Sequence, residues 1–174
     1  MDTKLKKVKK EFFCQNVVKV APNLLGKILV RKFDNRTINR YKITEVEAYR
    51  GTEDLACHAS KGRTARTEIM FHEGGVIYVY LIYGMYWMLN IVTGSENDAS
   101  AILIRGLEGI SGPGRVGKAL QLDKSLYGEN LSSSERIWIE DSDEKVTIHA
   151  SPRIGIQYAG EPWISKPWRY FISD

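Results

Sequence analysis

The stretch GVIYVYLIYGMYWMLNIV, residues 75–92, decides how this chain folds. Aromatic and β-branched residues fill its two halves, 75–82 and 86–92, and such residues favour the pleated surface of a β-strand. Tyr83 and Gly84 stand between the halves, where a glycine permits a tight turn. The stretch therefore predicts two antiparallel strands joined in a hairpin, with Tyr83 at the tip.

Further strand-like runs lie on both sides of this hairpin. Long strands are expected at residues 27–33, 38–49 and 100–107, and shorter ones at 137–139, 146–149, 154–156 and 169–172. Short helices are expected at 21–25, 64–71 and 116–122, and a mobile polar loop at 123–135. Because strands dominate, the expected class is α+β: a curved, mainly antiparallel sheet with a protruding hairpin and few helices.

The length and composition fit one soluble domain, residues 1–174, with a formal net charge of +4. Residues 1–11 are rich in lysine and are expected to form a basic, frayed end. We expect neither secretion nor membrane insertion, because no apolar run reaches the length of a membrane span and no signal peptide follows the lysines. Cys14 and Cys57 form no CxxC pattern and the three histidines are scattered, so no disulfide framework, metal site or cofactor is expected.

The strand at 44–49, TEVEAY, carries a candidate for acid–base chemistry. Side chains alternate across a strand, so Glu45, Glu47 and Tyr49 share one face while Val46 and Ala48 share the other. If the apolar face packs, two carboxylates and an aromatic ring are left together, and such a carboxylate can act as a general base on water. The alternative is an ordinary solvated strand face with two surface glutamates.

Tyrosines gather around the hairpin turn, at positions 78, 80, 83 and 86. A rigid aromatic at a protruding turn can enter a base stack, and aromatic walls can sandwich an extruded base. The alternative is a tyrosine-rich sheet surface without further function, because tyrosine suits strands.

Two basic segments could contact phosphates. Arg63 and Arg66 lie in the loop GRTAR, and Arg115 and Lys118 follow the turn Gly112-Pro113-Gly114 at an expected helix start. Glycines 112, 114 and 117 also match a dinucleotide-binding pattern, but that interpretation is rejected because no βαβ unit continues from them. Solvated loops and a plain helix start remain the simple alternatives.

Taken together, these motifs resemble one known family. ITEVEAYRGTEDLACH (residues 43–58) resembles the alkyladenine DNA glycosylases, the mammalian-type 3-methyladenine DNA glycosylases. So do YVYLIYGMYWMLN (78–90), AILIRGLEG (101–109), SGPGR (111–115) and RIGIQYAGE (153–161). The resemblance runs from about Phe12 to Phe171 with the motifs in the family's order, and it leaves residues 123–142 unassigned.

The resemblance implies roles for the matched residues. Glu47 would activate the attacking water, and Arg105 would lie near that water and the adjacent phosphate. Tyr83 would fill the gap left by a flipped nucleotide. The implied base pocket comprises Tyr49, His58, Tyr80 and Asn90, with Asn90 clashing with the exocyclic amino group of guanine. Ala65 departs from the proline that many relatives carry in the basic loop.

The implied activity is base excision from double-stranded DNA. Alkylated or deaminated purines, namely 3-methyladenine, 7-methylguanine, hypoxanthine or ethenoadenine, would be flipped out and their N-glycosidic bond hydrolysed, leaving an abasic site without strand cleavage. The protein is expected to act as a monomer without cofactor or metal, and in a prokaryote to be cytoplasmic and nucleoid-associated. Two alternatives are a nucleic-acid-binding domain of similar fold that has lost catalysis, and an RNA-binding domain of the formyltransferase type.

Overall fold

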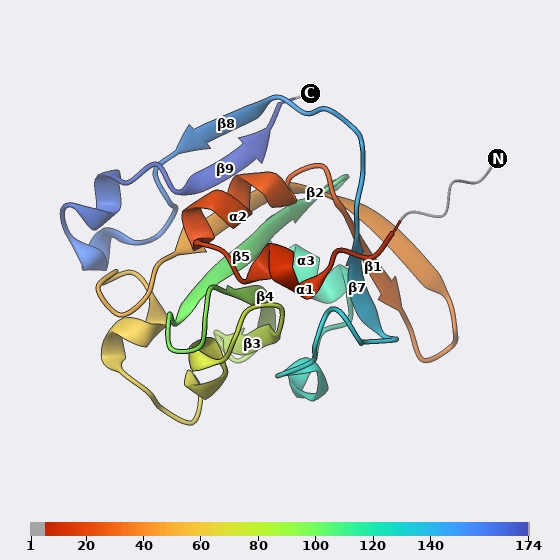
Figure 1. The fold of residues 1–174 in the computed structure, drawn as a ribbon, viewed down its shortest axis with the longest axis horizontal. Coiled ribbons are helices and arrows are strands. Elements are labelled where there is room, and N and C mark those ends of the chain that lie inside the picture. The colour runs from red at the N-terminus through yellow and green to blue at the C-terminus, as the bar shows by residue number, and fades with distance from the viewer. Residues whose placement is uncertain (1–5, 174) are drawn as a thin grey trace.

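A computed structural model describes residues 6–173, whose strands form one large antiparallel sheet (Figure 1). Neighbouring strands follow the order β3-β4-β5-β2-β1-β7, while β6 pairs with β5, and β9 joins β8 to β2. The strands are β1 Ile28–Lys32, β2 Ile38–Tyr49, β3 Ile77–Ile82, β4 Tyr86–Thr93, β5 Ser100–Leu107, β6 Ile110–Ser111, β7 Ile137–Glu140, β8 Ile148–Ser151 and β9 Arg169–Ile172.

The helices of the described residues are short. The α-helices are α1 Lys10–Phe13, α2 Val17–Leu24 and α3 Pro113–Ala119, and the 3-10 helices are η1 His58–Lys61, η2 Glu68–Phe71, η3 Lys124–Leu126, η4 Gln157–Ala159 and η5 Trp163–Ser165. Within residues 6–173, no helix is long and apolar enough to cross a membrane. Sheet and helices together confirm the predicted α+β class.

Strand β2 is the centre of the sheet. Its first half pairs with β1 through Ile38 to Lys42, and its second half pairs with β5 on one side and β9 on the other. The register with β5 shifts between Ile43 and Val46, and such irregularities bend a strand and increase its twist. The second half of β2 then continues beside β5, which in turn pairs with β4 of the hairpin.

The two faces of the sheet differ in chemistry because side chains alternate along every strand. One face is a dry core to which β2 contributes Val46 and Ala48, β3 Ile77 and Val79, β4 Leu89 and Ile91, and β5 Ile102 and Ile104. Helix α2 packs on this face against β2, β5 and β9, as Figure 1 shows. The opposite face carries the polar and aromatic side chains that the sequence placed in a candidate site.

Helix α2 follows directly from its sequence. Asn16 caps its start by accepting a hydrogen bond from the Val18 N–H at 2.9 Å. Val17, Val20, Ala21 and Leu24 recur at helical spacing and are all buried against the sheet. The helix therefore begins four residues before the segment 21–25 that the sequence predicts, because the cap and the apolar stripe both start earlier.

The expected frayed N-terminus differs from the structure in its described part. The Val8 N–H donates to the Ile139 carbonyl at 2.8 Å, the Val8 side chain is buried, and the backbone of Lys7 forms an isolated antiparallel β-bridge with Glu140. Residues 6–8 therefore dock along the edge strand β7, whose unpaired backbone groups offer a partner. Residues 1–5 of that segment lie outside the described residues.

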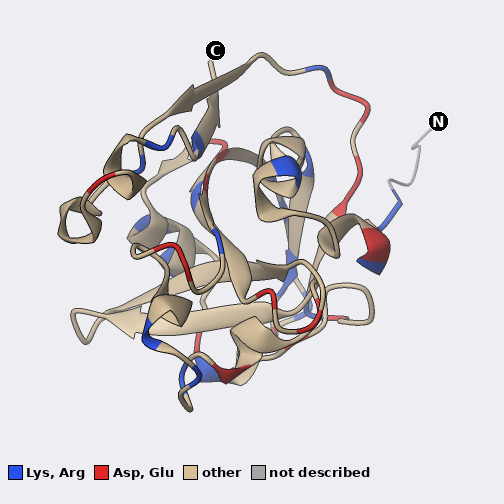
Figure 2. Ribbon diagram, turned by 60° about the vertical axis from the view of Figure 1, so that its left-hand side comes forward, with Lys and Arg blue, Asp and Glu red and all other residues tan. Residues whose placement is uncertain are grey.

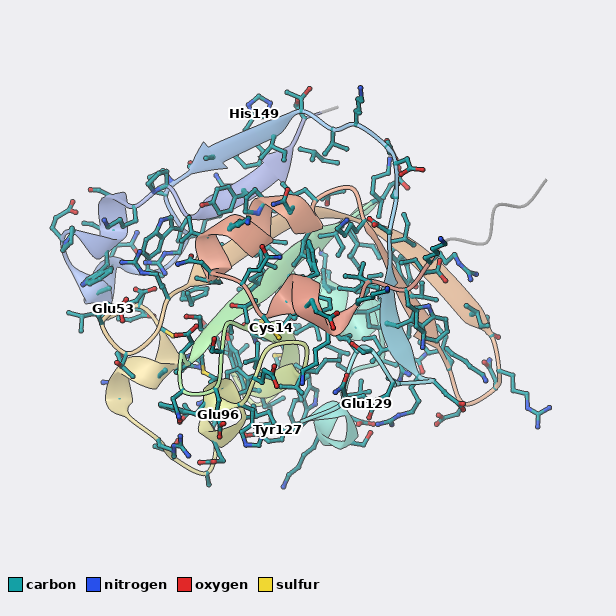
Figure 3. All side chains as sticks on the ribbon, in the orientation of Figure 1. Cys14, Glu53, Glu96, Tyr127, Glu129 and His149 are labelled. Carbon is teal, nitrogen blue, oxygen red and sulfur yellow. The ribbon has the colours of Figure 1, made fainter. Side chains whose placement is uncertain are left out.

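The segment 123–135 is packed rather than a free loop. Leu126 and Leu131 are buried in the main core, and the Leu131 N–H donates to the Gly75 carbonyl at 2.9 Å. Tyr127 and Glu129, labelled in Figure 3, lie in this segment, where Glu129 pairs with Arg136 at 2.7 Å. Two leucines in a polar sequence anchor the whole segment.

The expected strand at 154–156 is wrong. Ile156 is buried against Ala56 and Ala159, and the Ile154 N–H donates to a side chain instead of a neighbouring strand. The expected strand at 146–149 is displaced to β8, Ile148–Ser151, where it pairs with β9. The expected helices at 64–71 and 116–122 are the 3-10 helix η2, Glu68–Phe71, and α3, which begins at Pro113.

Gly117 explains part of the glycine pattern after β6. A Cβ at Gly117 would lie 2.0 Å from the Trp87 carbonyl oxygen, so this glycine lets α3 approach β4 closely. A Cβ at Gly114 would meet only the Tyr86 ring, at 3.0 Å. Gly117 therefore serves helix–strand packing, and it does so against a backbone atom that cannot move aside easily.

We expect Gly117→Ala to destabilise the protein, because the added methyl meets the backbone of a core strand. The loss should be about 2 kcal/mol or more, which corresponds to a fall in Tm of about 4–8 °C. Gly114→Ala is the matched control in the same helix and should change Tm far less. Equal Tm values for the two variants by differential scanning calorimetry would show that the close approach is not limiting.

Candidate active site

The polar face of the sheet lines a cavity of about 780 Å³ beside the β3–β4 hairpin. Strands β2 to β5 form its floor, and the loops at 56–58 and 154–158 form part of its rim. Nine of the candidate site residues singled out in the sequence line this one cavity: Glu47, Tyr49, His58, Arg66, Tyr78, Tyr80, Tyr83, Asn90 and Arg105. Arg63, Arg115 and Lys118 are not among its lining residues.

Glu47 lies in the floor of the cavity with no exposed surface. One carboxylate oxygen accepts a hydrogen bond from the Tyr49 hydroxyl at 2.8 Å, and the other accepts one from the Ile154 N–H at 2.6 Å. Burial raises the pKa of Glu47 above its ordinary value, while Arg105 and the two hydrogen bonds oppose that rise. The alternative of a solvated surface glutamate is therefore wrong for Glu47.

Arg105 connects the two glutamates of β2. Its Nε donates to Glu45 at 3.1 Å, and its guanidinium lies 3.7 Å from a Glu47 carboxylate oxygen. Arg169 on β9 also binds Glu45, at 3.2 Å. Glu45 is thus held by two arginines, which leaves the Arg105 guanidinium between Glu45 and Glu47 at the cavity floor.

Aromatic rings form the walls of the cavity. Tyr78 and Tyr80 on β3 share a face, with ring centroids 5.4 Å apart, as the strand alternation predicted. Burial raises the pKa of Tyr80 to about 12, so its hydroxyl stays protonated near neutral pH. The Tyr49 ring closes another side, and Arg153 stacks on it at 4.8 Å without lining the cavity.

His58 stands at the rim in a fixed orientation. Its Nδ1 lies 2.9 Å from the Tyr78 hydroxyl, and its ring contacts Tyr80 edge-on at 4.6 Å. Burial, with a contribution from the charge of Arg66, lowers the pKa of His58 to about 4. The imidazole is therefore neutral near pH 7, which suits contact with a base and makes His58 a poor proton donor.

Asn90 is buried where β4 passes under the cavity. Its side-chain amide donates to the Tyr78 carbonyl at 3.2 Å, across the β3–β4 register. This hydrogen bond fixes the side chain at the cavity wall. Asn90 can therefore present a rigid polar group to whatever enters.

The hairpin tip holds Tyr83 out into solvent. Tyr83 and Gly84 both have positive φ, 54° and 65°, and the Met85 N–H donates to the Ile82 carbonyl at 3.1 Å. Paired positive φ values are typical of the tight turns that close β-hairpins. The Tyr83 side chain is 83% exposed, and Leu81 and Met85 beside it are exposed as well. An apolar tip thus projects from the cavity edge.

Of the basic residues in the two predicted phosphate-binding segments, only Arg66 lines the cavity. The guanidinium of Arg66 stacks on Tyr80 at 4.7 Å and belongs to the cavity mouth. Arg63 instead binds Asn97 at 2.6 Å and Glu68 at 3.3 Å. Arg115 and Lys118 lie exposed on α3, next to the Pro113 that borders the cavity. Positive and negative residues are interspersed over the fold in Figure 2.

The sequence alone indicated no role for three residues of the site. Arg153 and Ile154 reach Glu47 and Tyr49 from the loop after β8, and Tyr158 lines the rim with 72% of its surface exposed. All three lie in RIGIQYAGE, whose match to the family was the available signal. Across residues 6–173, no group of three or more His, Cys, Asp or Glu side chains is arranged to hold a metal ion.

The chain is similar to known proteins over nearly its whole length. The family model for methylpurine-DNA glycosylase matches residues 11–112 and 108–174. A protein of Legionella pneumophila (strain Corby) named "Putative 3-methyladenine DNA glycosylase" is 43% identical, covering 98% of this chain and 96% of its own. Proteins of the same name from Psychrobacter cryohalolentis and Methanocella arvoryzae are 39% and 40% identical, covering 96% and 93% of this chain and 92% and 90% of their own.

The match therefore extends over nearly the whole described fold, including the strands that carry Glu47 and Arg105 and the hairpin that carries Tyr83. It includes the loop that brings Ile154 to the cavity floor. This chain belongs to the methylpurine-DNA glycosylase family.

Proposed function

We propose that this protein is a monofunctional DNA glycosylase that extrudes alkylated or deaminated purines from duplex DNA and hydrolyses their N-glycosidic bond. The observation that carries the proposal is the oriented carboxylate of Glu47 in the floor of an aromatic cavity, beside an exposed hairpin tip. A glycosidic carbon inside a duplex is out of reach, so the nucleotide must leave the stack before a buried carboxylate can act on it.

Glu47 would serve the reaction in two ways. As the base departs, positive charge develops on the sugar, and a nearby carboxylate stabilises it. The same carboxylate takes a proton from the attacking water, and a base works best when its pKa approaches the working pH. The burial that raises the pKa of Glu47 supports this role, and Tyr49 and Ile154 hold both oxygens in place.

Hydrolysis without strand cleavage follows from the residues available. A bifunctional glycosylase needs an amine nucleophile to form a Schiff base with the sugar. Among the described residues that line the cavity, none is a lysine. We therefore propose that water is the nucleophile and that the product is an intact strand with an abasic site.

Substrate choice would rest on stacking, leaving-group lability and exclusion by Asn90 more than on charge. A cationic base such as 3-methyladenine gains about 0.5–2 kcal/mol over an aromatic face. Here the guanidinium of Arg153 already stacks on Tyr49, and that of Arg66 on Tyr80. These resident cations reduce the preference for charged bases, so we include neutral hypoxanthine and ethenoadenine with 3-methyladenine and 7-methylguanine as candidate substrates.

The direct test uses labelled duplexes that each carry one of these lesions. After incubation with the protein, hot alkali cleaves any abasic site and reveals excision as a shorter labelled strand. An unmodified duplex is the control. Binding to lesion DNA without any cleavage product across all four lesions would favour a catalytically inactive nucleic-acid-binding domain.

Glu47→Gln should nearly abolish single-turnover excision, because the amide cannot accept the proton. General-base catalysis contributes about 10²- to 10⁴-fold, so a loss in that range is expected. Affinity for lesion DNA should stay similar. Glu140→Gln, at a buried glutamate on the far sheet edge, is the matched control and should retain activity. Near-normal excision by Glu47→Gln would remove Glu47 from the mechanism.

Tyr83→Ser should lower the population of extruded nucleotide, because the ring at the hairpin tip no longer fills the gap in the stack. Loss of about 1–3 kcal/mol of stacking corresponds to a drop of roughly five- to hundred-fold. Fluorescence of an ethenoadenine duplex reports extrusion. In Tyr83→Ser, the extruded population of a poorly paired lesion should fall less, because its extrusion costs less. Tyr83→Phe keeps the ring and should behave like the wild type. Equal signals from Tyr83→Ser and the wild type would rule out a wedge.

Arg66→Ala should make DNA binding less sensitive to salt. If Arg66 leaves Tyr80 to neutralise a phosphate, the slope of log affinity against log salt should become shallower by about 0.9. Fluorescence anisotropy with an undamaged duplex measures the slope. Lys19→Ala removes the same charge from α2, on the opposite face of the sheet, and should leave the slope unchanged. An unchanged slope in Arg66→Ala would mean that Arg66 touches no phosphate.

We propose Arg63, Arg115 and Lys118 as weaker phosphate contacts.

A further inference from the structure

Arg153 and Asp54 form an ion pair whose side chains have no exposed surface, directly behind the cavity wall. We propose that this pair is a latch that holds the Ile154 N–H against the Glu47 carboxylate, which makes Arg153 a positioning residue for excision. The proposal rests on the proposed role of Glu47 as the general base.

Asp54 organises the loop that follows β2. Its carboxylate accepts hydrogen bonds from the Arg50 N–H at 2.9 Å and the Ala56 N–H at 3.1 Å. The same two oxygens accept hydrogen bonds from the guanidinium of Arg153 at 2.6 and 3.0 Å. Asp54 therefore fixes the loop between Tyr49 and His58, and at the same time holds an arginine that lies 99 residues away in the sequence.

Arg153 ties several segments together at one point. Beyond Asp54, its guanidinium donates to the carbonyls of Ala48 on β2, at 3.0 Å, and Trp163 in η5, at 3.4 Å. Its planar group lies over Tyr49 at 4.8 Å and Trp168 at 5.0 Å. Only a planar, multidentate cation can satisfy these partners together, so a lysine would not replace it.

The latch reaches the catalytic carboxylate through one backbone step. Ile154 follows Arg153, and its N–H donates to Glu47 at 2.6 Å although the Ile154 side chain is 50% exposed. No strand pairing holds Ile154 in place, because it lies in the loop between β8 and η4. Downstream, Ile156 packs against Ala56 and the Tyr158 hydroxyl donates to the Ala56 carbonyl at 3.0 Å. Next to Ile154 itself, the buried Arg153 side chain ties the loop to β2 through the Ala48 carbonyl.

The pair contributes to this geometry more clearly than to stability. Burying two charges costs desolvation energy that their attraction offsets only with good geometry, and apolar residues of similar size often stabilise as well or better. The Arg153 Nε has no hydrogen-bond partner within residues 6–173, so the desolvation of the guanidinium is incompletely offset. A device that fixes orientation accounts for the pair better than a device that only adds stability.

A loss of the Ile154 hydrogen bond has a predictable signature. An N–H that donates to a carboxylate favours its charged form, so loosening the loop should raise the pKa of Glu47 further. Excision needs ionised Glu47, and the acid limb of the pH–rate profile should therefore move to higher pH. The charged and titratable groups that face Glu47 are Glu45 and Tyr49 on β2, Tyr80 on β3, Arg105 on β5, Tyr158 in η4, Arg169 on β9 through Glu45, and the latch itself.

The test is the pH dependence of single-turnover excision by Arg153→Lys. Lysine keeps the positive charge near Glu47 but cannot form the two-point contact with the Asp54 carboxylate. Any change in the pH profile therefore reports the position of the Ile154 N–H. We expect the acid limb to rise by about 1 pH unit, or about tenfold slower excision at a fixed pH on that limb. Arg40→Lys is the matched control, because Arg40 makes a two-point contact with Glu140 at the far edge of the sheet.

A second variant covers the case in which Arg153→Lys does not fold. Asp54→Asn with Arg153→Met removes both charges together, so neither is left buried and unpaired. Because the charge of Arg153 itself lowers the pKa of Glu47, the acid limb should rise at least as far as in Arg153→Lys. ¹³C NMR of labelled glutamate carboxyls can follow the titration of Glu47 without any reaction.

The outcomes are distinguishable. An acid limb that stays in place in a folded latch variant, even with a lower rate or a lower Tm, would show that the pair is merely structural. Failure of the base assignment would look different, because the acid limb of the wild type would then survive Glu47→Gln.

Discussion

Strand β2 must bury two unlike faces at once, and the rest of the structure depends on this constraint. Val46 and Ala48 enter a dry core beneath α2, while Glu47 and Tyr49 line the cavity and Glu45 pairs with Arg105 beside them. Because β2 pairs with β1, β5 and β9, neither face can turn away to solvent. The carboxylate of Glu47 is therefore held on the cavity side of the sheet, where Tyr49, Arg105 and the loop after β8 surround it.

Each of those partners reduces the cost of burying a charge. Arg105 reaches Glu47 from β5, Tyr49 supplies a hydroxyl, and the loop after β8 supplies the Ile154 N–H. A buried charge without such partners would be strongly unfavourable. The result is a carboxylate that is oriented but less stabilised than one in water, which is the state that suits a base and a stabiliser of positive charge.

The cavity has a buried, hydrogen-bonded floor and an exposed mouth. Its floor is set by core strands and hydrogen bonds between buried groups such as Asn90 and the Tyr78 carbonyl. Its mouth carries Tyr83, Arg66 and Tyr158, which are exposed. Chemistry on a flipped nucleotide demands this division, because reacting groups must be fixed while groups that meet DNA must reach out from the surface.

Local pattern in the sequence determined the strands and their faces, since alternation and turn residues act between near neighbours. The bounds of β2 and β5, the tip position of Tyr83 and the shared face of Glu45, Glu47 and Tyr49 were all predictable. The burial of Glu47, the Ile154 hydrogen bond, the Arg153–Asp54 pair and the docking of residues 6–8 on β7 were not. Only the tertiary structure decided these, because each joins residues distant in sequence through contacts that no local periodicity encodes.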